Sequence, residues 1–280
     1  MNFNRFQRVS QQRPRWEGII FPGIDSSNRQ ISIAYATPNK ELSNYIESMW
    51  FMSWNIENPN GLPCIIIPNP CCKFVCLQTG NVTNRPLFIG TREKADIFSL
   101  TGSGSTIGLD FQPGAFYPIL KKAINKDWPE SGLYADEFLE HLPLPPNEKW
   151  KEENLSKWLN SFEDYLLKLL LNSKEQNYKK IKFATEGILE GCFQVPEELA
   201  HQCDMSTRTL QRIFKKEVGL SPKNVLRIAR FNDAIRKIGQ DNFTEFVEVA
   251  LASGFFDQAH MVNEFQKLVA TSPSKFRRYL

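Results

Sequence analysis

The sequence predicts an α+β protein: an N-terminal β-rich domain of sandwich or barrel type with helices, then an all-α domain of two helix-turn-helix units joined by a linker helix. Three observations support this prediction. Short β-type runs fill the first part of the chain, apolar residues at helical spacing follow, and the C-terminal part contains an internal repeat. With 280 residues, the chain exceeds the usual size of one domain, so we expect two, spanning residues 1–176 and 177–280.

The N-terminal domain should be β-rich up to about residue 125 and helical over 126–172. Its β-type runs are ISIAYATP, IIIPNP, KFVCLQTGN, RPLFIGT and STIGLDFQPG. Runs at this spacing, broken by turn residues, are typical of a β-sandwich or small barrel. The stretch TGSGSTIG lacks the G-x-G-x-x-G spacing of a dinucleotide loop, so we interpret it as a hairpin. We expect Trp50, Phe51 and Trp54 to pack in the core.

A helix is predicted from about Asn154 to Leu171, because apolar residues recur there at helical spacing. Its wide apolar face suits two uses equally: packing inside the monomer, or pairing with the same helix of a second copy. The stretch LNSKEQNYKK that follows is typical of a polar linker. The apolar residues of the helix are Leu155, Trp158, Leu159, Phe162, Leu166, Leu169 and Leu170.

No pattern typical of a catalytic or metal site is present. The three histidines, His141, His201 and His260, lie in no metal-binding or nucleophile-activating motif. Four of the six cysteines cluster in CIIIPNPCCKFVC without paired C-x2-C spacing, so we expect buried, reduced thiols. Asp110 and Cys72 stay open as ligand contacts. We therefore expect no enzyme, no metal and no cofactor; the alternative is a ligand-binding or enzymatic β-fold domain with an attached nucleic-acid-binding module.

The helical part contains two copies of one supersecondary unit. A shift of 51 residues aligns LQRIFKKEVGLSP with MVNEFQKLVATSP, and a shift of 50 aligns Leu199 and Ala200 with Val249 and Ala250. Repetition of this kind indicates a duplicated structural element. We expect helix-turn-helix units at about 195–219 and 243–270.

Each unit is predicted to be a short helix, a tight turn and a longer helix. In the first unit, Pro196 suits the first helical position and Ser206 can cap the longer helix. In the second, Asn242 with Glu245 resembles a capping box, and Gly254 can supply the turn. The linker helix, SPKNVLRIARFNDAIRKI, starts with a Ser-Pro cap and carries Ile228, Phe231, Ile235 and Ile238 on one face.

Positive charge is concentrated in the C-terminal part. From Asn177 onward the chain has 16 Lys and Arg against 12 Asp and Glu, although the whole chain has a net charge of only +3. Between Ser206 and Lys237 there are nine basic residues and two acidic ones. Clustering of this kind is the electrostatic footprint of a polyanion-binding surface.

The longer helix of the first unit has the pattern of a DNA-reading helix. Arg208, Gln211, Arg212 and Lys215 share one side, and an apolar stripe occupies another. Arg can donate two bonds to guanine, Gln can pair with adenine, and Lys can neutralise phosphate. Taken alone, the basic residues of this helix fit an ordinary solvated face better than a DNA-reading face. The second copy favours DNA, because two units joined by a rigid helix can enter successive major grooves about 34 Å apart.

These residues resemble a known family. STRTLQRIFKKEVGLSP and VALASGFFDQAHMVNEF, followed by TSPSKFRR, are similar to the DNA-binding domain of AraC/XylS transcription regulators. Upstream, ELSNYIESMWFMSW and GLDFQPGAFYPIL resemble sensor domains of one AraC-like subgroup. The resemblance implies a sequence-specific regulator that binds double-stranded DNA and contacts RNA polymerase. It also implies a β-rich regulatory domain that takes a small-molecule effector or pairs in a homodimer.

The second unit departs from the family pattern. Members commonly place an Arg at the position of Asn263, and the repeat aligns Ala259, Val262, Asn263 and Gln266 with the four polar residues of the first reading face. We therefore predict that the first unit supplies most of the affinity. The base-contact candidates are Arg208, Gln211, Arg212, Gln258 and Asn263, the last two making weak contacts to an A·T pair or a thymine methyl group.

Phosphate contacts are predicted from both units and from the linker helix. His260 is either a phosphate contact or a packing residue. The phosphate-contact candidates are Ser206, Thr207, Lys215, Lys216, Lys223, Arg227, Arg230, Lys237, Lys275, Arg277 and Arg278.

A cytoplasmic protein without membrane attachment is expected. No apolar run is long enough to cross a bilayer, and the N-terminal stretch MNFNRFQRVSQQRPRW lacks the apolar core of a secretory signal.

Overall fold

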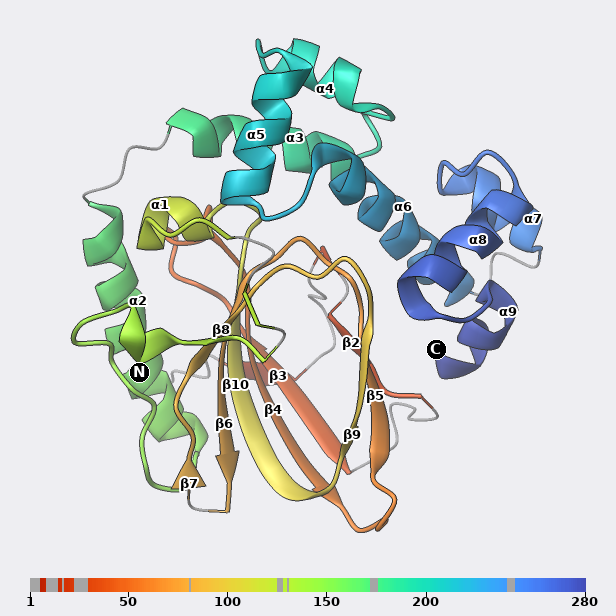
Figure 1. Ribbon diagram of the computed structural model, residues 1–280. Helices are drawn as coiled ribbons and strands as arrows, with labels where there is room; N and C mark the ends of the chain where they lie inside the picture. The colour runs from red at the N-terminus through yellow and green to blue at the C-terminus, as the bar shows by residue number, and fades with distance from the viewer. Residues whose placement is uncertain are drawn as a thin grey trace.

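The structure, a computed structural model, describes residues 6–8, 15–16, 18–22, 30–80, 82–124, 128–129, 131–171, 176–240 and 245–280. Over these ranges a β-rich N-terminal part precedes a helical part, which confirms the predicted fold class. The prediction that residues 126–172 are helical is too broad, because among the described residues of that segment the α-helix covers only Glu152–Leu170. In Figure 1 the helix α2 runs along one side of the β-domain, and the C-terminal helices lie across one end and one flank of it.

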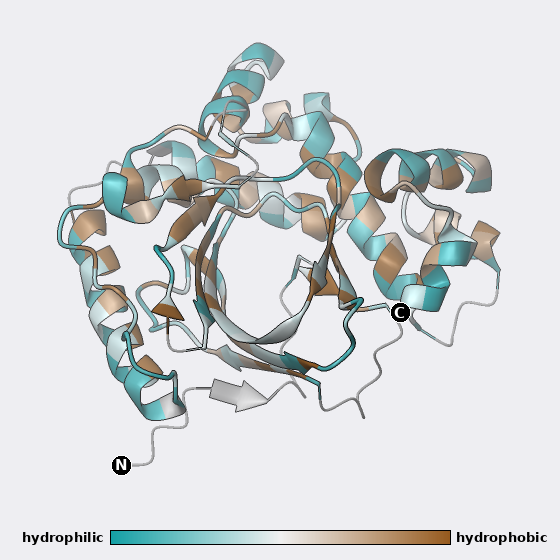
Figure 2. Ribbon diagram, turned by 60° about the horizontal axis from the view of Figure 1, so that its bottom comes forward, coloured by the Kyte–Doolittle hydropathy of each residue, from teal (hydrophilic) through white to brown (hydrophobic). Residues whose placement is uncertain are grey.

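Two antiparallel sheets form the β-domain. The larger has eight strands in the order β1-β3-β4-β10-β6-β8-β11, with β7 paired to β6, and the smaller has the order β2-β5-β9. Figure 2 shows the strands curving around a common axis, which fits the barrel-like prediction. The strands are β1 Phe6–Arg8, β2 Ile19–Ile20, β3 Ile31–Ala36, β4 Ile46–Ile56, β5 Leu62–Ile66, β6 Lys73–Thr79, β7 Val82–Thr83, β8 Leu87–Ile89, β9 Asp96–Leu100, β10 Gly102–Phe111 and β11 Leu133–Tyr134.

The hairpin predicted for TGSGSTIG is wrong. Residues 102–111 form one long strand, β10, between β4 and β6, and β9 pairs instead with β5 in the other sheet. Close packing of tryptophan rings explains why glycine occupies two positions of this strand. A Cβ atom at Gly104 would lie 2.4 Å from the Trp54 ring, and one at Gly108 would lie 2.0 Å from the Trp50 ring. The glycines therefore make room for indole rings on the neighbouring strand, rather than a turn.

The helix α2, Glu152–Leu170, packs its apolar face inside the monomer. Phe162 and Trp158 are buried against Phe74 of β6, with ring centroids 4.7 and 6.2 Å from the Phe74 ring. This contact decides between the two uses left open for the helix, because the apolar face is already covered within the chain. The short helix α1, Phe116–Leu120, and the 3-10 turn η1, Ala135–Glu137, belong to the same half of the molecule.

The helical half begins earlier than predicted. Helix α3, Gln176–Leu189, includes the end of the predicted polar linker, because Tyr178 and Ile181 have buried side chains that give this segment a packing face. The remaining elements are α4 Pro196–Gln202, α5 Thr207–Glu217, α6 Pro222–Ile238, α7 Phe246–Ala252, α8 Gln258–Val269, α9 Pro273–Phe276 and the 3-10 turn η2 Arg277–Tyr279.

Both helix-turn-helix units share their apolar cores with the β-domain. Trp16 and Cys71 are buried in the cluster formed by α3, α4, α5 and α6, and Ile65 and Ile67 are buried in the cluster formed by α6, α7 and α8. The two halves of the chain are therefore packed together rather than connected only by a linker. Asn232 of α6 is completely buried and donates a hydrogen bond of 3.1 Å to the Pro68 carbonyl oxygen of the β-domain.

Candidate nucleic-acid interface

The first unit is built by α4, a tight turn and α5. Pro196 occupies the first turn of α4, and the Ser206 hydroxyl accepts a hydrogen bond from the Thr209 N–H at 3.2 Å, so both predicted end signals are confirmed. Asp204 adopts a positive φ of 50° in the turn. Lys180 of α3 donates a 2.7 Å hydrogen bond to the Cys203 carbonyl oxygen and so supports the same turn.

Helix α5 has one buried and one exposed side. Leu210, Ile213 and Phe214 are buried. The four side chains of the predicted reading face are all exposed, and Arg208, Arg212 and Lys215 make no ion pair within the described residues. These three cations, which form no ion pair among the described residues, lie on one side of a packed helix and create a positive surface that can accept phosphate or the acceptor edge of guanine.

The second unit follows the same plan with a longer turn. The carboxylate of Asp257 caps α8 by accepting a hydrogen bond from the His260 N–H at 2.6 Å, and Gly254 supplies the predicted turn with a φ of 76°. The predicted capping box at the start of α7 is wrong. Glu245 is itself the N-cap residue, its side chain makes no capping bond, and Asn242 lies outside the described residues.

The positions of α8 that correspond to the four polar residues of the α5 reading face carry no charge. Gln258, Ala259, Asn263 and Gln266 are exposed, and Val262 is half-buried. Both helices bury an apolar stripe, but at these corresponding exposed positions only α5 carries cations. The exposed cation of α8, Lys267, lies near the end of the helix and pairs with Glu264.

His260 serves the packing of this unit. Its Nδ1 accepts a hydrogen bond from the Phe256 N–H at 3.3 Å, and its ring meets the buried Phe255 ring edge-on at 5.4 Å. These contacts favour the packing interpretation of His260.

The linker helix α6 starts at its predicted cap. The Ser221 hydroxyl accepts a hydrogen bond from the Asn224 N–H at 3.2 Å, and Pro222 occupies the first turn. The face predicted to pack, formed by Ile228, Phe231, Ile235 and Ile238, is buried. Continuous burial along this helix fixes the two units relative to each other.

Several predicted phosphate contacts are instead engaged within the protein. Arg227 forms an ion pair with the buried carboxylate of Glu264 in α8, and Lys237 pairs with Asp233 one turn away. The Lys216 ammonium lies 4.5 Å from the centre of the Tyr117 ring of α1. Within the described chain these three cations therefore already have partners, which lowers their availability to DNA.

The other candidates differ in accessibility. Arg230 is half-buried, and burial lowers the pKa of its guanidinium. The Arg277 guanidinium lies 4.6 Å from the centre of the Phe246 ring. Ser206 and Thr207 lie at the start of α5, where exposed N–H groups can meet a phosphate. Besides Lys215 of α5, the phosphate-contact candidates with exposed basic side chains and no contact described above are Lys223, Lys275 and Arg278.

Glu264 joins α8 to the linker helix. Burial alone would raise the pKa of this carboxyl group, but hydrogen bonds from Arg227 and Lys267 outweigh burial and hold the pKa below its ordinary value. The ion pair therefore stabilises the ionised form at neutral pH. Arg227, predicted as a phosphate contact, acts in the structure as the anchor of the second reading helix.

The β-domain contacts both units directly, and these contacts were missed by the sequence reasoning. The Ile124 N–H donates to the Lys216 carbonyl oxygen at 3.2 Å, and the Ala95 N–H donates to the Leu268 carbonyl oxygen at 2.7 Å. Glu93 accepts a 2.7 Å hydrogen bond from the Asn224 amide. No local pattern marks these residues, since each partner lies more than 90 positions away along the chain.

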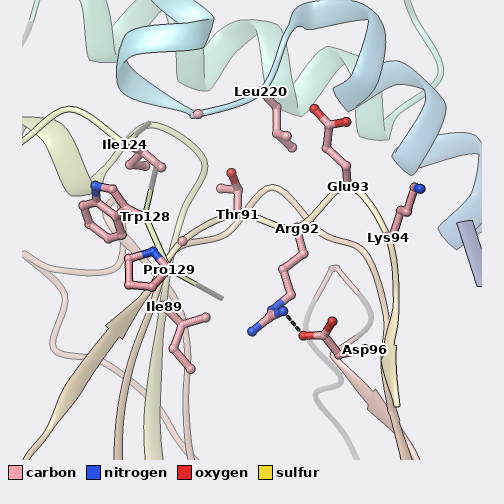
Figure 3. Close-up of a pocket in the computed structure, with 12 residues that line it drawn as sticks. Ile89, Thr91, Arg92, Glu93, Lys94, Asp96, Ile124, Trp128, Pro129 and Leu220 are labelled. Carbon is pink, nitrogen blue, oxygen red and sulfur yellow. Dashed lines mark ion pairs between the residues drawn. The ribbon is translucent and has the colours of Figure 1, made fainter. Parts of the chain in front are cut away.

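A pocket of about 330 Å³ lies at this junction (Figure 3). Its walls come from the β8–β9 loop, from the segment after α1 and from the turn between α5 and α6. Figure 3 shows the Arg92 guanidinium paired with Asp96, the Trp128 ring on the opposite wall, and Leu220 above them. Side chains of both halves of the chain thus surround one space.

The described residues contain no group of three or more His, Cys, Asp and Glu side chains placed to hold a metal ion. The four clustered cysteines are buried and unpaired, and burial raises the pKa of the Cys64 and Cys76 thiols to about 11 and 12.

Among the described helices, none is long and apolar enough to cross a membrane. Asp110 is buried and accepts hydrogen bonds from Ser48, Trp50 and Lys73, which satisfies its charge within the sheet.

A family model described as a helix-turn-helix domain matches residues 199–279, which contain both units. The transcriptional activator RhaS of Pectobacterium atrosepticum is 32% identical to this chain over 79 residues. The C-terminal region of the chain is an AraC-type helix-turn-helix domain. The match to RhaS spans 28% of this chain and 28% of RhaS.

Further similarities to this AraC-type domain are found in other organisms. An uncharacterized helix-turn-helix regulator of Haemophilus influenzae is 30% identical over 82 residues, which cover 29% of this chain and 27% of that protein. A second family model, a domain of unknown function, matches residues 35–126 of the β-domain.

Solved structures resemble the chain more distantly. The DNA-binding domain of AdpA in complex with target DNA is 27% identical, with a TM-score of 0.32, and the match covers 36% of this chain and 87% of that one. ToxT from Vibrio cholerae is 12% identical with a TM-score of 0.40, and the match covers 99% of both chains. TM-scores this low do not establish a common overall arrangement.

Proposed function

We propose that this protein is a sequence-specific, DNA-binding transcription regulator. The observation that carries the proposal is the exposed cationic side of α5, which projects from a helix-turn-helix unit whose apolar stripe is buried. The second unit, held on the same linker helix, supports a two-part binding site. The curated relatives are regulators as well, which argues against the alternative of an enzymatic β-fold with an attached binding module.

The mechanism is major-groove docking by two helices of unequal strength. Helix α5 enters one major groove, where Arg208 and Arg212 donate to guanine and Gln211 pairs with adenine. Lys215 neutralises a backbone phosphate. Helix α8 enters the next groove and contributes weaker contacts from Gln258 and Asn263. The first unit therefore supplies most of the binding free energy.

The phosphate contacts form a smaller set than the sequence pattern suggested. Lys223, Lys275 and Arg278 are exposed and free to approach the DNA backbone, and Ser206 and Thr207 offer the N-terminus of α5. Lys216, Arg227 and Lys237 contribute to the fold instead, through the contacts described above. Arg230 and Arg277 are partly covered and contribute less.

The N-terminal half acts as the regulatory part. We divide the chain into residues 1–176 and 177–280, and we place an effector in the junction pocket, where a small molecule would touch both halves. Effector binding or homodimer formation would then change how the two units meet the operator or RNA polymerase. The protein would act in the cytoplasm, where the chromosome lies.

Fluorescence anisotropy of the full-length protein tests the proposal. A duplex selected from a random library should bind more tightly than a scrambled duplex of the same length, and the affinity should fall steeply between 50 and 200 mM salt, as expected when several phosphates are neutralised. Lys215→Ala should reduce the salt slope by about one. Equal binding of both duplexes, or affinity independent of salt, would refute the proposed function.

A further inference from the structure

The turn of the second unit contains one residue more than the turn of the first. Helices α4 and α7 correspond at an offset of 50 residues. The hydrogen bonds that close the two turns keep this offset. In the first turn the Met205 N–H donates to the Ala200 carbonyl oxygen, and in the second the Phe255 N–H donates to the Ala250 carbonyl oxygen. The N-cap residues of α5 and α8 correspond at an offset of 51. The additional residue is Phe256.

Phe256 differs from the neighbouring residues of the turn in how much of its side chain is exposed among the described residues. Met205 packs against the core of the first unit, and its counterpart Phe255 is buried in the core of the second. Phe256, by contrast, is 85% exposed. Its backbone is held in place, because its N–H donates to Nδ1 of His260. A bulky apolar ring is thus presented to solvent on an ordered turn.

The ring directly precedes the N-cap of the second reading helix. In helix-turn-helix complexes the N-terminal residues of this helix contact the base edges. The following turns of α8 present Ala259 and Val262, which are small and apolar, and Asn263, which is uncharged. The reading side of the second unit therefore combines apolar surface with amide groups, whereas that of the first carries three cations.

We propose that Phe256, with Ala259 and Val262, forms a surface that contacts the 5-methyl groups of thymine in the major groove. Thymine is the base that presents a methyl group there, and apolar side chains are its usual partners. An apolar surface would gain little from guanine or from phosphate. This inference rests on the proposed DNA-binding function and assigns the second unit a T-containing half-site.

A protein partner is the competing occupant, since Leu251 and Val247 of α7 are also exposed, at 61% and 47%. These two side chains lie on the first helix of the unit, however, while Phe256 lies at the start of the reading helix. The position of Phe256 favours DNA. Leu251 provides a matched control, because it is an exposed apolar side chain of the same unit away from the reading helix.

The test replaces single thymines with deoxyuridine, which removes only the methyl group. With full-length protein and its selected duplex, replacement at one or two positions should weaken binding about fourfold, which corresponds to one methyl group returned to water at about 0.8 kcal/mol. Phe256→Ala should lower the affinity for the thymine duplex and abolish the difference between the two duplexes. Leu251→Ala should retain that difference.

Two results would overturn the inference. The first is that replacing thymine with deoxyuridine weakens binding at no position. The second is that the affinity ratio between the thymine and deoxyuridine duplexes is the same for Phe256→Ala as for the wild type. Circular dichroism of Phe256→Ala should match the wild type, because the side chain is exposed. Failure of the proposed function itself has a different signature, since the wild type would then show no preference for the selected duplex over the scrambled one.

Discussion

Gly219 provides a sensitive probe of the contact between the β-domain and the first reading helix. It lies two residues after α5 with a φ of 85°, and a Cβ atom there would lie 2.6 Å from Ile124 Cγ2 and 2.7 Å from Thr91 Oγ1. Gly219→Ala therefore carries two costs. The positive φ costs about 1 kcal/mol for a residue with a side chain, and overpacking against a buried neighbour costs about 1 to 3 kcal/mol.

A matched glycine separates the two costs. Gly191 has a φ of 74° but no atom within 4 Å of the position of a Cβ. Gly191→Ala should therefore lower the free energy of unfolding by about 1 kcal/mol, and Gly219→Ala by about 2 to 4 kcal/mol. Urea unfolding of the full-length variants, followed by circular dichroism, measures both values.

A double variant identifies the neighbour. Ile124→Ala removes Cγ2 and should relieve part of the overlap, so Gly219→Ala should cost less in that background than in the wild type. If Gly219→Ala and Gly191→Ala destabilised the protein equally, or if the Ile124 background made no difference, the β-domain would not pack against this turn.

Three further predictions concern other contacts. Glu264→Gln should destabilise the protein at pH 7, because the lowered pKa of Glu264 means that its ionised form stabilises the fold. In urea unfolding across pH, the difference from the wild type should be full above the ordinary pKa of 4.5, decline below it, and vanish as the pH falls through the lowered pKa of the folded state. Ser206→Ala should lower the free energy of unfolding by about 1 kcal/mol, because it removes the side-chain cap of α5. Glu245→Ala should lower it by less, because the Glu245 side chain makes no capping bond, and thermal unfolding compares the two variants. A thiol reagent at neutral pH should label one cysteine of the native protein, Cys192, and all six after unfolding; rapid labelling of more than one native thiol would contradict the buried placement of the others.

Local signals in the sequence predicted the helical half well. The caps at Ser206 and Ser221 and the apolar side of α5 depend on residues within two turns of one another, so their spacing is sufficient to find them. The duplication of the unit was equally visible. The one-residue difference between the offsets of 50 and 51 was present in the sequence too, but only the structure locates it at Phe256.

Contacts between distant residues were not predictable in the same way. The glycines of β10 resembled a turn, because the indole rings that require them belong to β4, about 50 residues earlier. Lys216 and Arg227 matched a phosphate-binding pattern, yet their partners Tyr117 and Glu264 lie on other helices. A count of cations along one helix does not show which of them are already paired by the tertiary fold.

The central claim is that the first unit dominates recognition of a two-part DNA site. It is tested most directly by comparing Arg212→Ala and Asn263→Ala on the same selected duplex. Loss of the arginine should weaken binding by about 1 to 3 kcal/mol, and loss of the asparagine should weaken it by less. Asn263→Ala impairing binding more than Arg212→Ala would contradict the claim.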